Sequence, residues 1–249
     1  DRINTAVGLS AGLSVTTGIQ NTLIGALAGD AITTGSYNSL VGVNAGGATT
    51  TGAQNAAFGQ GALSLNTTGS TNTALGDSSL ANSTTASNNT AVGQAALAAN
   101  LTGAFNTAVG ALAGDALTTG DSNIAIGYVS LSSDTKGERA VAVGEGALFT
   151  QNFTSETNNY NTAVGYNAGY TVSTGVQNTL IGGLAGDAIT TANANTAVGY
   201  ASLGLTTTGA LNAAVGSSAL ASNTSGANNV AMGFAALQLN TTASNNTAL

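Results

Sequence analysis

The sequence has no cysteine, histidine, proline or tryptophan, and these absences exclude several kinds of site at once. Without cysteine there is no disulfide, and without cysteine or histidine the chain lacks the usual ligands of zinc and haem. It also lacks the histidine base and the cysteine nucleophile of many hydrolases, and its serines have no histidine partner. We therefore expect no catalytic residue, no metal and no cofactor, and a protein that is not an enzyme.

Charged residues are also scarce, with three basic and ten acidic side chains and a net charge of −7. The only cations, Arg2, Lys136 and Arg139, are too few to form a basic surface for a phosphate backbone, so we expect no nucleic-acid binding. No stretch is long and apolar enough to span a bilayer, and we expect no membrane insertion in this segment. With 43% hydrophobic residues, the composition is that of a folded protein.

Glycine recurs on a fixed period of 17 residues along nearly the whole chain. The one exception lies between Gly144 and Gly165, where four extra residues lengthen the interval to 21. So short and strict a period indicates a solenoid, in which each coil contacts mainly its neighbours. The members of this column are Gly8, Gly25, Gly42, Gly59, Gly76, Gly93, Gly110, Gly127, Gly144, Gly165, Gly182, Gly199, Gly216 and Gly233.

Each repeat begins Asn-Thr-Ala-Val-Gly and ends near Thr-Thr-Gly, which favours strands over helices. Thr-Ala-Val alternates between an Asn and a Gly, as a short strand between turns does. A 17-residue unit rich in Gly, Thr and Asn cannot hold two helices. The sequence predicts an all-β parallel β-solenoid of about 14 coils, one repetitive domain over residues 1–249, with a second short strand through the Ala-Leu or Thr-Thr segment of each coil. Because the pattern stops in mid-unit at Leu249, we also expect the chain to be a fragment of a longer one.

Two columns of the repeat are expected to be structural. The Asn four places before each Gly should bond its side-chain amide from coil to coil, and only Ala140 interrupts that column. The Gly column should supply positive φ or close backbone approach. Representative pairs are Asn21 with Gly25, Asn106 with Gly110, and Asn178 with Gly182.

Two apolar columns are expected to lie on the outside of a thin coil. One is the Val, Ile or similar residue before each glycine, and the other is a recurrent leucine four places after it. Alanine already fills most of a narrow interior, so both columns should form a long exposed stripe, which typically marks an interface. Three chains around a common axis would cover it, and the sequence predicts a parallel homotrimer. The leucines are Leu63, Leu80, Leu97, Leu131, Leu148, Leu203, Leu220 and Leu237.

The repeats resemble those of a known group. The runs 72–80, 89–97 and 161–169, close to Asn-Thr-Ala-Val-Gly-x-x-Ala-Leu, are similar to repeats of trimeric autotransporter adhesin heads and of phage and bacterial tail-fibre-like proteins. The resemblance covers residues 4–249. It implies a left-handed parallel β-roll, an extracellular position on a virion fibre or cell surface, and a rigid shaft or head for host or surface attachment.

One segment, residues 134–160, departs from the repeat and carries the four-residue insertion. Such an insertion maps to a loop on one face, and its charges form local ion pairs in the simplest interpretation. The alternative is a contact with a host receptor or glycan through exposed aromatic and charged side chains. The candidate contacts are Lys136, Glu138, Arg139, Phe149, Phe153 and Tyr160.

The acidic residues raise two further hypotheses, both disfavoured. Ala-Gly-Asp occurs three times, but a calcium-binding β-roll needs an Asp in every turn, so these acids are interpreted as solvated turn residues. A pair of carboxylates for glycoside hydrolysis is conceivable only near the insertion. The residues concerned are Asp30, Asp115 and Asp187 for calcium, and Glu138, Glu145 and Glu156 for hydrolysis.

Two alternative functions remain open at this point. Paired threonines such as Thr16 and Thr17 suggest an ice-binding solenoid, although neighbours on a strand point to opposite faces. The absence of atypical capping units suggests a self-polymerising extracellular filament subunit.

Overall fold

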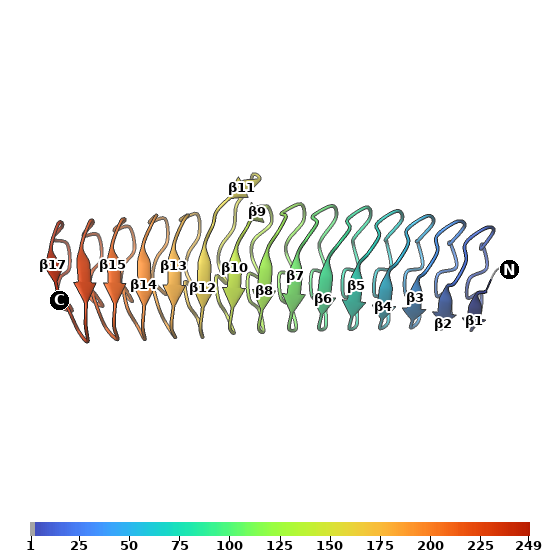
Figure 1. Ribbon diagram of the computed structural model, residues 1–249, viewed down its shortest axis with the longest axis horizontal. Helices are drawn as coiled ribbons and strands as arrows, with labels where there is room; N and C mark the ends of the chain where they lie inside the picture. The colour runs from blue at the N-terminus through green and yellow to red at the C-terminus, as the bar shows by residue number, and fades with distance from the viewer. Residues whose placement is uncertain (1–2) are drawn as a thin grey trace. The chain divides into compact units, whose positions relative to one another are not determined.

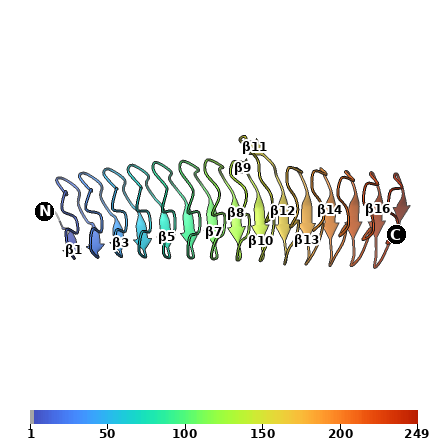
Figure 2. The same cartoon turned by 180° about the vertical axis from the view of Figure 1, so that it is seen from behind.

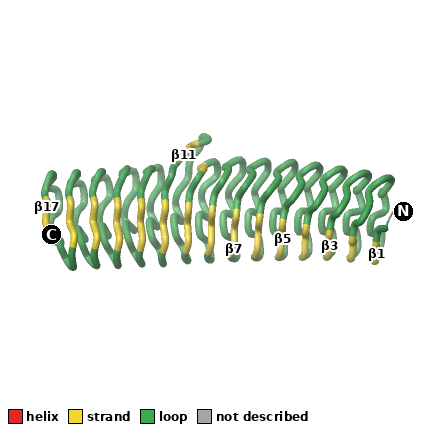
Figure 3. Tube along the Cα trace, viewed as in Figure 1, coloured by secondary structure: helices red, strands yellow, loops and turns green. Residues whose placement is uncertain are grey.

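The computed structural model describes residues 3–249, and every regular element in that range is a β-strand (Figures 1 and 3). The chain divides into two compact units, Asp1–Asn123 and Ile124–Leu249, and Arg2 lies outside the described residues. Each unit is a parallel β-solenoid with turns of about 17 residues, about 14 coils in all, which confirms the expected class. The prediction of one continuous domain stays a prediction, because it concerns how the two units join.

Each regular coil contributes one strand, which pairs in parallel with the strand 17 residues further on, as Thr179 does with Thr196. Unit 1 contains β1 (Thr5–Val7), β2 (Thr22–Ile24), β3 (Ser39–Val41), β4 (Ala56–Phe58), β5 (Thr73–Leu75), β6 (Thr90–Val92) and β7 (Thr107–Val109). Unit 2 contains β8 (Ile124–Ile126), β9 (Gly137–Glu138), β10 (Val141–Val143), β11 (Thr157–Asn158), β12 (Thr162–Val164), β13 (Thr179–Ile181), β14 (Thr196–Val198), β15 (Ala213–Val215), β16 (Val230–Met232) and β17 (Thr247–Ala248).

The expectation of a second strand in every coil is wrong for the described residues. Only β9 and β11 form a second, two-stranded sheet, and they lie at the insertion. In the Ala-Leu segment the backbone turns through left-handed residues, such as Ala95 at φ 55° and Leu97 at φ 51°. In the Thr-Thr segment the N–H groups of Thr33, Thr34 and Gly35 converge on the carbonyl oxygen of Thr50. Both segments are therefore turns rather than strands, although their backbone N–H groups still bond to the next coil.

The asparagine column forms the expected ladder inside each unit. The backbone N–H of Asn38 and its side-chain Nδ2 both donate to Oδ1 of Asn21, at 2.9 and 3.1 Å. The same Nδ2 also donates to the carbonyl of Gly52, 14 residues later, at 3.0 Å. Each asparagine thus ties its coil to the preceding one and closes the coil on itself.

The glycine column is structural as well. Gly25, Gly110 and Gly182 have φ values of 133°, 134° and 135°, which side chains rarely adopt. A Cβ on Gly182 would lie 2.5 Å from the carbonyl oxygen of Gly199 in the next coil. The column therefore combines positive φ with close backbone approach.

The prediction for the leucine column is wrong, because these leucines form the core. Leu63, Leu80 and Leu97 have no exposed surface, and neither have Leu131, Leu148, Leu203 and Leu220, while Leu237 in the last complete coil is half-buried. Their left-handed backbone directs the side chain inward. For Leu97, the strain of φ 51° costs about 1–3 kcal/mol. Burying the side chain contributes about 1.5–3 kcal/mol, so the two terms nearly cancel.

The large side chain that fills the interior comes from one of two positions of the coil, four or seven residues after the repeat glycine. Where the leucine is present, the residue three places later is small or polar, as in the pair Leu97 and Asn100. Where glycine replaces the leucine, that later residue is usually a large apolar one, as in Gly114 with Leu117. Both Leu97 and Leu117 are fully buried. The narrow interior thus holds one large side chain from either position.

The apolar residue before each glycine points outward, as expected. In the strands the middle residue is buried and its two neighbours are not, a pattern shown by β4, β7 and β13. Val7, Ile24 and Phe58 are 58, 39 and 42% exposed. In each unit an apolar column therefore runs along the outer face of the sheet, beside a column rich in threonine.

Two adjacent glycines offer a matched test of the glycine column. We expect Gly182→Ala to destabilise each chain by about 1–3 kcal/mol, because its φ is strained and its Cβ meets backbone. Gly183 has ordinary φ, and a Cβ there would make only van der Waals contact at 3.7 Å with Tyr200. Gly183→Ala should be neutral or stabilising, by up to about 1 kcal/mol. Denaturant unfolding compares the two, and equal stabilities would contradict the structural role of the column.

Because one large side chain fills the interior from either position, we expect the stability effects of substitutions at Leu97 and Asn100 to be coupled. Leu97→Gly should cost about 2–5 kcal/mol by opening a cavity, and Asn100→Leu alone should cost about 1–3 kcal/mol by overpacking. The double variant reproduces the arrangement of Gly114 and Leu117, so it should be at least about 1 kcal/mol more stable than the sum of the single effects. A double-mutant cycle by chemical denaturation measures the coupling, and additive effects would refute it.

Candidate functional site

The insertion is the one place in unit 2 where the chain leaves the regular coil. The loop 152–158 projects beyond the neighbouring turns (Figures 1 and 2). It lies on the side of the unit away from the sheet that β8, β10 and β12 to β17 form; we call this sheet, like that of β1 to β7 in unit 1, the long sheet. Strand β11 within it pairs in parallel with β9 of the preceding coil, with Thr157 opposite Gly137. The hydroxyl of Thr135 donates to the carbonyl of Phe153 at 2.9 Å. The loop is thus held to the preceding coil rather than hanging free.

A buried carboxylate anchors the base of this loop. Oδ1 of Asp134 accepts hydrogen bonds from the N–H groups of Gly137 and Phe153 at 2.9 and 3.1 Å, and Oδ2 accepts from Nε2 of Gln151 at 2.6 Å. Oε1 of Gln151 in turn accepts from Nδ2 of Asn161 at 2.8 Å. Burial raises the pKa of Asp134, and the hydrogen bonds from Gln151 and the backbone oppose that rise. Asp134 is a structural acid that ties the start of the loop, at Phe153, to the preceding coil.

The insertion also repairs the break in the asparagine column. Ala140 has no side-chain amide that could accept a hydrogen bond from the next coil. The backbone N–H of Asn161 donates instead to Oδ1 of Asn159, at 2.9 Å. Asn159 belongs to the lengthened coil, two residues before Asn161. Sequence reasoning missed the roles of Asp134, Gln151 and Asn159. The one signal in the sequence for the role of Asn159 is that Ala140 interrupts the asparagine column directly before the insertion.

Four of the six candidate contact residues lie at the base of the loop or beside it. Nη1 of Arg139 donates to the hydroxyl of Tyr160 at 2.8 Å, and its guanidinium carbon lies 5.7 Å from the centroid of that ring. Tyr160 is 49% exposed. Lys136 and Glu138 are half-buried beside β11, and the N–H of Thr157 donates to the Lys136 carbonyl. Neither Lys136 nor Arg139 forms a salt bridge with an acid among residues 3–249.

The other two candidates lie apart from this pair. Phe149 stacks on Tyr170 of the following coil, with ring centroids 5.0 Å apart and planes 7° from parallel. Phe153 belongs to the loop itself and is only 7% exposed. The ligand-contact hypothesis stays a prediction, and its accessible side chains are Arg139 and Tyr160.

The acids do not gather into a reactive site. Among the described residues no group of three His, Cys, Asp or Glu side chains is placed to hold a metal ion. Glu145 and Glu156 are exposed and Glu138 is half-buried. The chain offers isolated carboxylates, which is the simpler interpretation of the three Ala-Gly-Asp turns as well.

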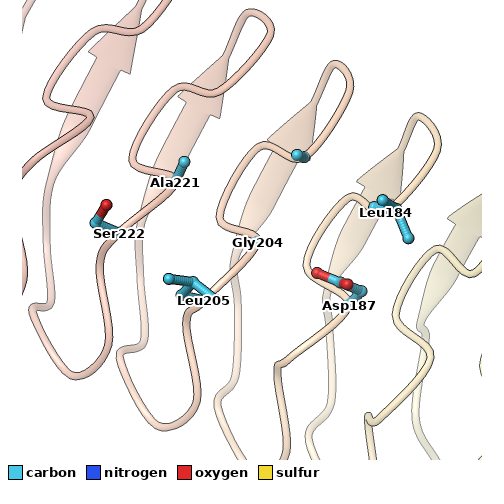
Figure 4. A pocket seen from close by; sticks show the side chains of 7 residues that line it. Leu184, Asp187, Gly204, Leu205, Ala221 and Ser222 are labelled. Carbon is cyan, nitrogen blue, oxygen red and sulfur yellow. The ribbon is translucent and has the colours of Figure 1, made fainter.

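A shallow hollow of about 230 Å³ lies beside one of those turns in unit 2 (Figure 4). It forms because Gly204 and Ala221 occupy, in the next two coils, the position that Asp187 occupies in its own. Leu184, Ala201, Leu205 and Ser222 complete the lining. Burial raises the pKa of Asp187, against the lowering effect of its own N–H and that of Ala188. One carboxylate over apolar walls gives no catalytic pair.

Residues 3–249 contain no helix that is long and apolar enough to cross a membrane. Comparison with protein-family models, with curated proteins and with solved structures gives no match for this chain. The functional argument therefore rests on the geometry of the coils and of the insertion.

Asp134 predicts a particular dependence of stability on pH. Its pKa is raised above the ordinary 3.8, so between 3.8 and the raised value the folded state binds more protons than the unfolded state. The free energy of unfolding from this group therefore falls as pH rises through that window, by at most about 1.4 kcal/mol per pH unit. Asp134→Asn keeps an acceptor oxygen but cannot titrate.

We expect the stability of the wild type relative to Asp134→Asn to fall through this window and to be flat on either side. Asp187 is present in both proteins and cancels. Denaturant unfolding from pH 3 to 7 measures the difference. A difference that rises with pH, or does not change, would show that burial does not dominate at Asp134.

Proposed function

We propose that this chain is a non-enzymatic structural module, a rigid trimeric shaft or head on a virion fibre or cell surface that serves attachment to a host or other surface. The observation that carries the proposal is the repetition of one hydrogen-bonded coil in each unit, interrupted once by a projecting loop. A chain so uniform has little besides that loop to recognise a ligand. Its repeated coils are suited to spacing and display.

The interactions between coils support a stiff module. Each coil that begins with asparagine adds a strand pairing and a link of the asparagine ladder, as Asn195 does with Asn178 through bonds of 3.0 and 3.3 Å. In such an array stability is approximately a sum over repeats and their interfaces. Extracellular rigidity therefore needs no disulfide in this chain.

The Arg139 and Tyr160 pair is the best-supported ligand contact on the module. Arg139 has no carboxylate partner among the described residues, so most of its N–H donors face solvent. A guanidinium fork binds carboxylates and hydroxyls, and the exposed Tyr ring supplies a flat apolar surface. A glycan or a receptor loop with an acidic group fits this chemistry.

An ice-binding solenoid is the second candidate. The structure favours a version of it that uses the threonines of the strands instead of the paired threonines. Paired threonines such as Thr33 and Thr34 differ in exposure and form no flat array. The strands, in contrast, direct Thr90 and Val92 to the same outer face. Strong inhibition of ice recrystallisation at micromolar protein would favour this candidate over attachment.

Removal of the loop tests the attachment role. Deleting residues 154–157 restores a 17-residue coil and leaves Asp134 and Asn159 in place. We expect this variant to remain folded and to lose binding on an array of neutral and acidic saccharides and on host-surface extracts. Arg139→Ala should weaken binding at least about tenfold, equivalent to roughly 1.4 kcal/mol.

Thr208→Ala, an exposed change in another coil of unit 2, is the matched control and should bind as the wild type does. If the deletion variant binds as tightly as the wild type, the loop is not the contact. If the wild type binds no saccharide or host surface, the attachment role itself is contradicted.

A further inference from the structure

The outer face of the long sheet in each unit is free of charge, although charged residues occur at several other positions of the coil. It is formed by the first and third residues of each strand, such as Thr107 with Val109 and Thr196 with Val198. None of these positions in β1 to β8, β10 or β12 to β17 carries an Asp, Glu, Lys or Arg. We call this surface the strand face.

The charged residues lie elsewhere in the repeat. Asp77 and Glu145 follow the glycine of the coil, Asp187 lies in the next turn, and Lys136 and Arg139 lie near β9. Charges are therefore kept out of one face while the neighbouring positions accept them. An uncharged column of Val, Ile, Leu, Phe and Met beside threonine has the character of the buried centre of an interface rather than of a solvated surface.

The size of the strand face is adequate for association. Three-residue strands at about 3.3 Å per residue and a strand spacing of about 4.8 Å give the seven strands of unit 1 a planar area of roughly 300 Å². Unit 2 offers a similar area on its eight corresponding strands. Each unit thus supplies a little under half of the roughly 800 Å² per partner of a standard interface.

We infer that the strand face binds a second copy of this chain, parallel and in register, so that the apolar columns of the copies meet. This rests on the proposed trimer and identifies the surface through which it forms. The strand face presents an equivalent side chain every 17 residues, as Val198 and Val215 show. Only a partner surface with the same period can pack against each of these side chains in the same way. A second copy offers that period, the same absence of charge and the same apolar column.

Parallel, in-register packing follows from rotational symmetry about an axis along the coils. Such symmetry brings each side chain to the level of its own counterpart, so Phe58 meets Phe58 and Met232 meets Met232. In an antiparallel pair, residues from different coils would meet, and only one level would bring identical residues together. The two arrangements therefore differ in which single positions can be cross-linked.

The absence of native cysteine makes this difference measurable. Single cysteines replace Val41 or Val92 in unit 1 and Val164 or Val215 in unit 2, with Thr51→Cys and Thr208→Cys as exposed controls outside the strand face. Each variant of the full chain is treated with an oxidant and, separately, with a short bis-maleimide. The maleimide covers cases in which the Cα atoms lie beyond the roughly 4.4–6.8 Å that a disulfide needs.

We expect cross-linked dimers from all four strand-face variants and none from the controls. Cross-linking at one level only would overturn the parallel register. A trimer by light scattering with cross-links only from the control positions would overturn the strand face but leave the trimer intact. A monomer at micromolar concentration would overturn both, whereas loss of saccharide binding on deletion of the loop would still support attachment.

A charge on the face provides a second measurement. Val198→Lys should weaken association at least tenfold, because the lysine would be buried against its own copies. Thr208→Lys should leave association unchanged. Circular dichroism of the two variants separates a loss of association from a loss of folding. Equal association of both variants would contradict the inference.

Discussion

The asparagine amide at the start of each coil is the interaction on which the rest of the structure depends. Its oxygen accepts two hydrogen bonds from the next coil, and its nitrogen also reaches the carbonyl near the end of its own coil, as Asn55 reaches Gly69 at 2.9 Å. One buried side chain therefore sets both the spacing between coils and the length of each coil. Loss of an amide would leave buried donors unpaired, at about 1–3 kcal/mol each. Any change in coil length has to be compensated at this column.

The need for glycine and the composition of the core both follow from the coil length that the asparagine sets. With the coil closed after 17 residues, successive backbones meet at the glycine column, where Gly93 has no room for a Cβ beside Gly110. The interior that remains is narrow, and it is filled by alanine and by one leucine or isoleucine in most coils. The left-handed turn that directs a leucine inward is nearly neutral in energy, which explains why either glycine or leucine can occupy that position.

Much of this organisation follows from the sequence, because it is periodic. The 17-residue coil, the parallel strands, the amide ladder of Asn21 and its counterparts and the role of Gly182 all have a signal at fixed spacing. The leucine column was misassigned because its direction depends on a positive φ that leucine rarely adopts. The anchor of the insertion was missed because Asp134 and Gln151 occupy a position that varies between coils. A single occurrence has no period from which to infer a partner.

The insertion shows what an irregular element requires in such a fold. At Ala140 the ladder has no amide, and the lengthened coil supplies Asn159 in its place, while a buried acid holds the loop that results. Exposed residues of distinct chemistry, Arg139 and Tyr160, occur beside this repair. The regular coils, in contrast, keep charge away from the strand face and vary mainly at turns. Under the proposed function, association would use what the regular coils repeat, and recognition would use the one coil that differs.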